Sequence, residues 1–182
     1  MGKEGEHCYK YPRPSVTVDA AIIAKAGNGK PAQVLLIQRK KPPCEGQWAL
    51  PGGFVDENEP LDHAAARELK EETSLDAKQS GVVLEQIGAF GDPGRDPRGW
   101  CVSVAYAALV PPGMGVQAAD DAAEAEWFDV SQPPSKLAFD HKLIIRTAFE
   151  HLLKQHTGKG DLADSLRAGV EQLQGDWERP SE

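Results

Sequence analysis

Residues 53–75 read GFVDENEPLDHAAARELKEETSL, and they place three carboxylates, Glu68, Glu71 and Glu72, on one face of a predicted helix. Successive helical residues advance by about 100°, so the three side chains project into an arc of about 100°. Like charges at this spacing repel one another and destabilise the helix that carries them. A hard divalent cation such as Mg²⁺ reverses this effect, because it binds a few carboxylates together with substrate phosphates. The alternative is a solvated acidic face, the usual meaning of a run of like charges.

The preceding turn, Leu50-Pro51-Gly52-Gly53, favours the metal site, because glycine lets bare backbone approach a ligand closely. The stretch resembles the signature of the Nudix hydrolase family, G-x5-E-x7-R-E-U-x-E-E-x-G-U, where U is a bulky apolar residue. The positions that match it are Gly53, Glu59, Arg67, Glu68, Leu69, Glu71, Glu72 and Leu75. One position departs, since Ser74 stands where the family has glycine. Serine adopts the left-handed conformation of a helix C-cap at modest cost, so the departure concerns the helix end and not the carboxylates.

The resemblance implies both a fold and a chemistry. The fold is an α/β/α sandwich with a mixed β-sheet, which belongs to the α/β or α+β class. The reaction is hydrolysis of a nucleoside diphosphate linked to another group, with Mg²⁺ or Mn²⁺ as cofactor. The resemblance also implies that Glu71, Glu72 and the Gly52 carbonyl bind the metal, and that Glu68 binds metal or acts as the base. Arg67 would hold a carboxylate in place by a charge-assisted bond, or alternatively form only a surface pair with Glu71.

A second candidate region for the catalytic base lies outside this stretch. In several branches of the family the base lies on a loop before a late strand, and the corresponding loop here is residues 118–124, AADDAAE. Asp121 and Glu124 are the candidates on it, with Asp120 beside them. The alternative is that these are ordinary acids of a solvated loop. The sequence leaves open whether Glu68 or a residue of this loop is the base.

Four further segments resemble the ADP-ribose pyrophosphatase branch of the family: YPRP at residues 11–14 with VTVDAAI at 16–22, GDPGRDPRGWCVSVAY at 91–106, AADDAAEAEWF at 118–128 and LAFDH at 137–141. Arg95 and Arg98 in the second segment are predicted to clamp a diphosphate through bidentate bonds. The alternative is that they are solvent-facing cations that balance neighbouring aspartates. These segments make ADP-ribose the expected substrate.

Two other side chains complete the predicted substrate-binding set. Trp48, beside the proline-glycine turn, is predicted to stack on a base or a ribose, or alternatively to be a core aromatic under the sheet. Arg39, at the start of the loop after the second predicted strand, is the other candidate.

Patterning along the chain predicts a mixed order of strands and helices. Strands are expected at residues 16–24, 34–38, 48–50, 82–90, 101–110 and 126–130, and helices at 61–73 and 139–155, with a weaker amphipathic helix at 161–174. The catalytic domain is therefore predicted to span residues 1–157, followed by a polar tail at 158–182. Without the resemblance, these elements would indicate only an α/β or α+β domain.

Composition excludes several classes of function. A formal net charge of −8 argues against a nucleic-acid partner, since phosphate-backbone binding needs clustered Lys and Arg. No apolar run is long enough for a membrane span, and the first residues contain no signal peptide. The three cysteines are odd in number and lack metal-site spacing, which predicts reduced thiols in the cytoplasm. The family resemblance adds a homodimer as an expectation.

The predicted function is metal-dependent hydrolysis of ADP-ribose to AMP and ribose 5-phosphate. One alternative is a house-cleaning hydrolase that acts on oxidised nucleoside triphosphates or on NADH. Another is a protein of the same fold that binds a nucleotide and signals without turnover. The intact carboxylates, and the lack of a basic recognition helix, argue against this last alternative.

Overall fold

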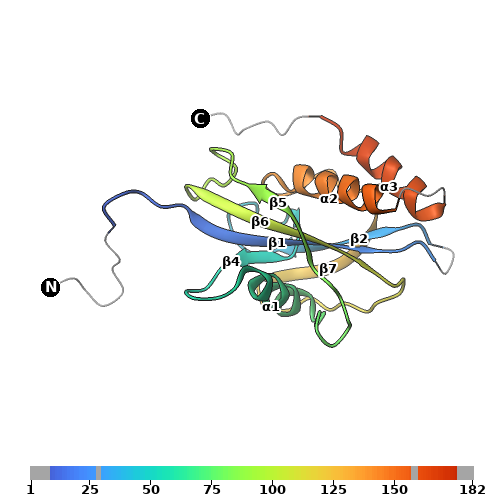
Figure 1. The fold of residues 1–182 in the computed structure, drawn as a ribbon, viewed down its shortest axis with the longest axis horizontal. Helices are drawn as coiled ribbons and strands as arrows, with labels where there is room; N and C mark the ends of the chain where they lie inside the picture. The colour runs from blue at the N-terminus through green and yellow to red at the C-terminus, as the bar shows by residue number, and fades with distance from the viewer. Residues whose placement is uncertain (1–8, 28–29, 157–159, 176–182) are drawn as a thin grey trace.

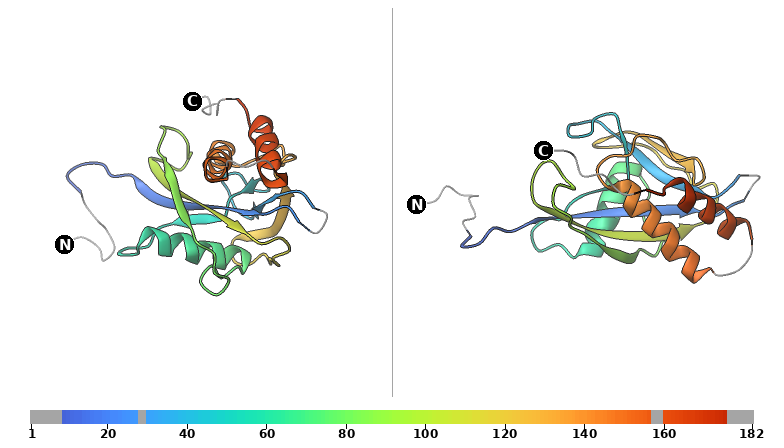
Figure 2. Two further views of the ribbon diagram at one scale, coloured as in Figure 1. Left: turned by 45° about the vertical axis from the view of Figure 1, so that its right-hand side comes forward. Right: turned by 90° about the horizontal axis from the view of Figure 1, so that it is seen from above.

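The computed structural model describes residues 9–27, 30–156 and 160–175, and its centre is a mixed sheet with helices on both faces (Figure 1). The helix that carries the acidic cluster covers one face, and the two C-terminal helices cover the other (Figure 2). The strands are β1 Ser15–Ala24, β2 Gln33–Arg39, β3 Trp48–Ala49, β4 Gly52–Phe54, β5 Glu85–Phe90, β6 Cys101–Val110 and β7 Ala122–Asp129, and the helices are α1 Leu61–Thr73, α2 His141–Gln155 and α3 Asp161–Gln172. This arrangement confirms the predicted α+β sandwich with a mixed sheet.

The central strand pair is β1 and β6, which run parallel in register from Ser15 opposite Cys101 to Ala24 opposite Val110. Both strands are buried along most of their length, as is typical of parallel strands covered on two faces. On its other edge, β1 pairs with β4 up to Asp19 and with β2 from Ile23 onward. The sheet therefore divides beside Asp19, next to the glycine turn that opens β4.

Consecutive residues of the strands point to opposite faces and build two separate cores. Ile23 contributes to the cluster under α2 and α3, whereas Ile22 contributes to the cluster under α1. Leu36 and Leu35 on β2 divide in the same way. From the helices, Phe149 fills the first cluster and Leu69 the second. These near-continuous apolar runs explain why the strands are recognisable in the sequence.

Helix α1 has the bounds that its pattern predicts, and it ends at Ser74 with φ 60° and ψ 9°. This is the left-handed conformation expected of a glycine at that position, and the Ser74 N–H donates to the Lys70 carbonyl. The Ser74 hydroxyl also donates to the Gln117 carbonyl at 3.1 Å. Serine therefore replaces glycine here without disturbing the helix end.

Several predicted boundaries were wrong. The short strand β4 was missed because two of its three residues are glycines, which carry no strand pattern. Strand β7 begins at Ala122, not at residue 126, so Glu124 lies within a strand and not on the predicted loop. The fifth strand begins at Glu85, three residues after the predicted start.

Helix α3 lies within the predicted tail and is packed on the same core as α2. Leu166 is fully buried and belongs with Phe149 in one apolar cluster. Gly169 makes the close approach possible, because a Cβ there would lie 2.7 Å from the Phe149 ring and from the Val130 carbonyl oxygen. The rest of the predicted tail, residues 176–182, lies outside the described residues. None of the helices in the described ranges is long and apolar enough to cross a membrane.

Candidate active site

The acidic face of α1 and the glycine turn line one pocket of about 320 Å³. Strand β2, strand β4 and the segments before β6 and β7 complete its walls. The predicted site residues that line it are Arg39, Gly52, Arg67, Glu68, Glu71, Glu72, Arg98 and Asp121. Most of the side chains selected from the sequence are therefore brought together by the fold.

The two glycines of the turn are held between β1 and α1. A Cβ on Gly52 would clash with the Val18 carbonyl oxygen, and a Cβ on Gly53 would clash with the Glu68 carboxylate. The Gly52 N–H donates a hydrogen bond of 2.9 Å to Glu72 Oε2. The turn thus approaches the acidic helix more closely than any larger residue would permit.

Glu72 is the most buried carboxylate of the acidic cluster, with 7% of its surface exposed. Burial raises the pKa of its side chain to about 8, and the hydrogen bond from Gly52 opposes this effect only in part. Burial also raises the pKa of Glu68, against the opposing influence of Arg67. Without a cation, burial therefore disfavours the charged form of both the Glu68 and the Glu72 carboxyl groups.

Arg67 donates hydrogen bonds to three carboxylates at the acidic face of α1. Its Nε and Nη2 donate to the two oxygens of Glu59 at 2.8 and 2.9 Å, and Nη1 donates to Glu68 Oε1 at 2.8 Å. The i,i+4 contact with Glu71, at 3.1 Å, also forms. Arg67 holds the pKa of Glu59 at about 2, well below its ordinary value. Both predicted contacts of Arg67 are therefore present at once.

The donor set of the pocket fits a hard divalent cation. Within the described ranges, no three Asp, Glu, His or Cys side chains are grouped as a ready-made metal site, and Arg67 donates hydrogen bonds to Glu68 and Glu71. Mg²⁺ does not require such a cage, since it keeps several waters and binds through one or two carboxylates plus substrate phosphates. A buried carboxylate at Glu72, beside the backbone of Gly52, supplies oxygen ligands of this kind.

The two loop candidates for the base are in different places. Asp121 lines the pocket and pairs with Lys41 Nζ at 2.7 Å. Glu124 is exposed on β7 opposite Gln38, and it does not belong to the pocket lining. Strand pairing separates Glu124 from the loop, so Glu124 is no longer a candidate, while Asp121 and Glu68 are.

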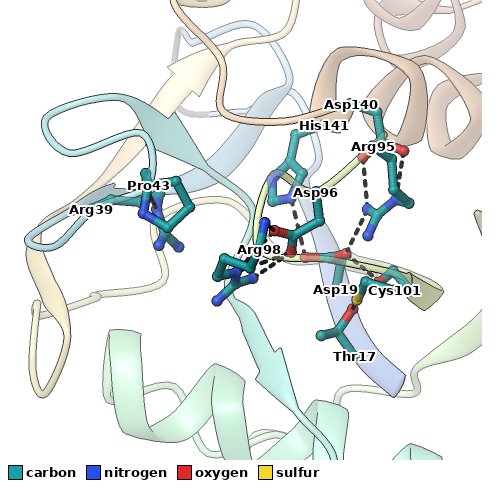
Figure 3. A network of polar contacts seen from close by, with 11 residues as sticks. Thr17, Asp19, Arg39, Pro43, Arg95, Asp96, Arg98, Cys101, Asp140 and His141 are labelled. Atoms are coloured by element: carbon teal, nitrogen blue, oxygen red, sulfur yellow. Dashed lines mark hydrogen bonds and ion pairs between the residues drawn. The ribbon is translucent and has the colours of Figure 1, made fainter. Parts of the chain in front are cut away.

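The two arginines of the 91–100 segment also differ from each other (Figure 3). Arg98 lines the pocket, pairs with Asp96 at 2.6 Å and lies over the Phe54 and Phe139 rings. Arg95 is only 4% exposed, and its Nε and Nη2 donate to the two oxygens of Asp140 at 2.8 and 2.7 Å. The prediction that Arg95 is a flexible diphosphate clamp was wrong, because its donors are engaged in a buried ion pair.

The aromatic and cationic candidates at residues 39 and 48 also have different surroundings. Trp48 contacts Phe128 edge-on, with ring centroids 4.6 Å apart, and packs against the core under α2. It is not among the pocket residues, so the alternative of a core aromatic is the correct one. Arg39 lines the pocket and lies over the Phe139 ring, 5.0 Å from its centroid.

Sequence reasoning missed a buried polar network behind the pocket (Figure 3). It contains Asp19, Ser103, Asp140 and His141, and it is joined to Arg95. Burial lowers the pKa of His141, so its ring is neutral at ordinary pH. In the sequence, the segment LAFDH shows only a resemblance to the ADP-ribose pyrophosphatase branch. A lone histidine at the start of a helix is more commonly a packing residue. A signal in the sequence was the pair of adjacent polar residues, Asp140 and His141, at the start of an amphipathic helix.

Comparison with known proteins relates this geometry to a family. The NUDIX domain profile matches residues 15–148. The chain is 44% identical over 136 residues to an ADP-ribose pyrophosphatase of Methanocaldococcus jannaschii, covering 75% of this chain and 73% of that protein. It is 41% identical over 145 residues to the ADPR responsive transcriptional repressor NtrR of Acinetobacter baylyi, covering 78% of this chain but only 56% of the repressor.

A solved structure shows the same arrangement. The NUDIX domain of Shewanella oneidensis NrtR, crystallised with ADP ribose, superposes with a TM-score of 0.68 and 36% sequence identity. The match covers 78% of this chain and 90% of that domain.

Proposed function

This chain belongs to the NUDIX family of pyrophosphohydrolases, and from that premise we propose that it hydrolyses the diphosphate bond of ADP-ribose to AMP and ribose 5-phosphate. The observation that carries the proposal is a single pocket lined both by the carboxylates of α1 and by the guanidinium groups of Arg39 and Arg98. A diphosphate needs both, because a metal ion held by the carboxylates and the guanidinium groups of the arginines neutralise different oxygens of the same group. The likeness to an ADP-ribose pyrophosphatase and to a domain crystallised with ADP ribose supports the choice of substrate.

Glu71, Glu72 and the Gly52 carbonyl would hold Mg²⁺ or Mn²⁺, with Glu68 as a further ligand or as the base. When bound, such an ion neutralises charge on phosphate oxygens and lowers the pKa of water. Arg67 orients Glu68 and Glu71 through the hydrogen bonds that its Nη1 donates. Arg98, whose side chain pairs with Asp96, would contact the diphosphate from the segment before β6.

The reaction adds one water across the phosphoanhydride. The water oxygen forms a bond to one phosphorus, the P–O bond of the anhydride breaks, and a base accepts the proton of the water. Glu68 and Asp121 both line the pocket and are the two candidates for that base. Comparing the pH dependence of kcat for Glu68→Gln and Asp121→Asn at saturating metal decides between them, because only loss of the base removes the acidic limb of the profile.

A second candidate function is nucleotide sensing without turnover. The likeness to an ADP-ribose-responsive repressor favours it, although the chain spans only 56% of that protein. Binding of ADP-ribose without product formation would support the sensor. Hydrolysis of oxidised nucleoside triphosphates or of NADH is the enzymatic alternative.

Product analysis with Mg²⁺ against ADP-ribose, NADH and 8-oxo-dGTP tests the proposal, with Glu72→Gln as the control. We expect AMP to form fastest from ADP-ribose and to disappear in the variant. Pyrophosphate from 8-oxo-dGTP as the main product would overturn the substrate and keep the chemistry.

The setting of this activity is also part of the proposal. We propose a homodimer that acts on a small nucleotide in the cytoplasm, without nucleic acid or membrane as partner. Free thiols at Cys44 and Cys101 support a reducing compartment. Exposed aromatic side chains at Tyr11 and Trp100, near the start of β1, support an interface there. Sedimentation velocity tests the dimer.

A further inference from the structure

Asp140 and His141, at the start of α2, are consecutive buried side chains that contact two different segments next to the pocket, and Figure 3 shows both side chains. His141 Nδ1 accepts a hydrogen bond of 2.8 Å from the Leu50 N–H, at the start of the glycine turn. Asp140 accepts two hydrogen bonds from Arg95, in the segment that also carries Arg98. Adjacent residues at the start of α2 therefore contact the glycine turn and the segment that carries Arg98.

The orientation of the His141 ring is determined by its partners. Because Nδ1 accepts from a backbone N–H, the proton of the neutral ring is on Nε2, which lies 3.4 Å from Asp19 Oδ1. Asp19 in turn accepts a hydrogen bond from the Ser103 hydroxyl through its other oxygen. The ring is thus fixed between the centre of β1 and the turn.

Besides the pairing of β4 with β1, three hydrogen bonds to different elements hold the turn. The Ala20 N–H donates to the Pro51 carbonyl at 2.8 Å, and the Gly52 N–H donates to Glu72 at 2.9 Å. The bond from Leu50 to His141 is the third, and it alone reaches the helical layer on the opposite face of the sheet from α1. Removing it would free the end of the turn that is farthest from Glu72.

Asp140 occupies the N-cap position of α2 but does not cap the helix with its side chain. Its carboxylate is turned toward Arg95, although capping of the first turn ordinarily stabilises a helix by about 1 kcal/mol. The preceding residue, Phe139, has φ 53°, which an L-residue rarely adopts. Backbone strain next to a forgone cap is typical of a segment shaped by its contacts with a site.

We propose that His141 and Asp140 are positioning residues of the active site: His141 sets the glycine turn for metal binding, and Asp140, through Arg95, sets the segment that carries Arg98 for substrate binding. The metal half of this inference rests on the proposed function. Arg95 Nη2 lies 3.9 Å from Asp19 Oδ2, so the two halves meet at Asp19. The effect of His141 on metal binding and the effect of Asp140 on substrate binding can nevertheless be measured separately, because His141 contacts the glycine turn and Asp140 contacts Arg95.

The test measures Mn²⁺ affinity by titration calorimetry and KM for ADP-ribose, in the full chain. His141→Asn places an amide oxygen near the Nδ1 position, whereas His141→Gln places its amide near Nε2 and leaves the Leu50 N–H unpaired. We expect His141→Gln to weaken Mn²⁺ binding by roughly 10–100-fold, the effect of losing an outer-shell contact. We expect His141→Asn to restore most of it. Asp140→Asn should raise KM and leave Mn²⁺ affinity unchanged.

Two exposed pairs serve as matched controls. His151→Gln removes a histidine of the same helix that contacts Glu85, and Asp164→Asn removes the partner of Arg167 on α3. Both should leave Mn²⁺ affinity and KM unchanged. A folded His141→Gln protein with wild-type Mn²⁺ affinity, or an Asp140→Asn protein with wild-type KM, would overturn the inference. Wild-type protein that neither binds Mn²⁺ nor hydrolyses ADP-ribose would instead overturn the proposed function, and the metal half with it.

Discussion

The backbone amide of Gly52 donates to the carboxylate of Glu72, and this bond joins the glycine turn directly to the acidic helix. Two segments that lie twenty residues apart in the chain are therefore in direct contact. The contact has an unfavourable feature without a cation, because the Glu72 carboxyl is buried. Stability and activity should consequently respond in opposite directions when this carboxyl is changed.

Glu72→Gln should abolish turnover, lowering kcat/KM for ADP-ribose by several orders of magnitude, while the metal-free protein becomes more stable at pH 8. The amide cannot supply a charged ligand, but its oxygen still accepts from Gly52. A gain on the order of 1 kcal/mol would raise Tm by about 2–4 °C in a protein of this size. Calorimetric melting and product assays measure the two effects. Near-normal turnover would contradict the metal-site assignment.

The pH dependence of stability follows from the same carboxyl. Its pKa is about 8 in the folded state, against an ordinary value of 4.5 for a glutamate in the unfolded chain, so the folded state binds the extra proton between these values. The contribution is fully present below pH 4.5 and is lost as pH rises through about 8. Metal-free wild type should therefore lose stability across this window, and Glu72→Gln should lose less. Urea unfolding at several pH values checks this, and parallel curves would contradict it.

Arg98→Ala and Arg95→Ala should fail in different ways. Arg98 lines the pocket and is partly exposed, so its loss should raise KM for ADP-ribose and lower Tm by less than the loss of Arg95 does. Arg95 is buried against Asp140, and removing one partner of a buried pair costs about 3–5 kcal/mol. Melting temperatures and kinetics of both variants make the comparison. An Arg95→Ala protein with the Tm of wild type would contradict the stabilising role of the buried ion pair.

Ser74→Gly should preserve activity and change stability by less than about 1 kcal/mol. Glycine relieves the left-handed backbone at φ 60°, while the hydroxyl bond to the Gln117 carbonyl is lost. Ser74→Ala separates these contributions, because it loses the bond and keeps the strain. A large loss of activity in Ser74→Gly would show that the hydroxyl has a role in the site.

Gly169→Ala should destabilise the protein by about 1–3 kcal/mol, the usual cost of overpacking a core. The added methyl would meet the Phe149 ring and the Val130 carbonyl. Gly115→Ala is a suitable control, because a Cβ there meets nothing within 4 Å. Equal Tm values for the two variants would mean that α3 does not contribute to the core.

The sequence was most informative where residue type and spacing alone specify the outcome. The α1 bounds and the central strands could be predicted, because helical and strand periodicity reflect which faces are buried. The β4 strand could not, since glycines carry no such pattern. The left-handed conformation at Ser74 was suggested only by the glycine that the family signature has at this position. Arg95 was misplaced because burial of a loop arginine depends on a partner, Asp140, that is distant in sequence. Trp48 was misplaced because its contact with Phe128 also joins segments that are distant in sequence. The network around His141 depends on four separate segments, and only the fold brings these together.

The parallel pairing of β1 with β6 also has a consequence for how the chain folds during synthesis. The central strand of the sheet is made early, and its longest partner is made only after the acidic helix. Because contacts between distant segments are slow to form, β1 must wait with an unpaired, apolar edge while the acidic helix is already complete. The glycine turn and α1 can associate early, but the buried network behind them cannot. Most of the chain must therefore be synthesised before the active site can form.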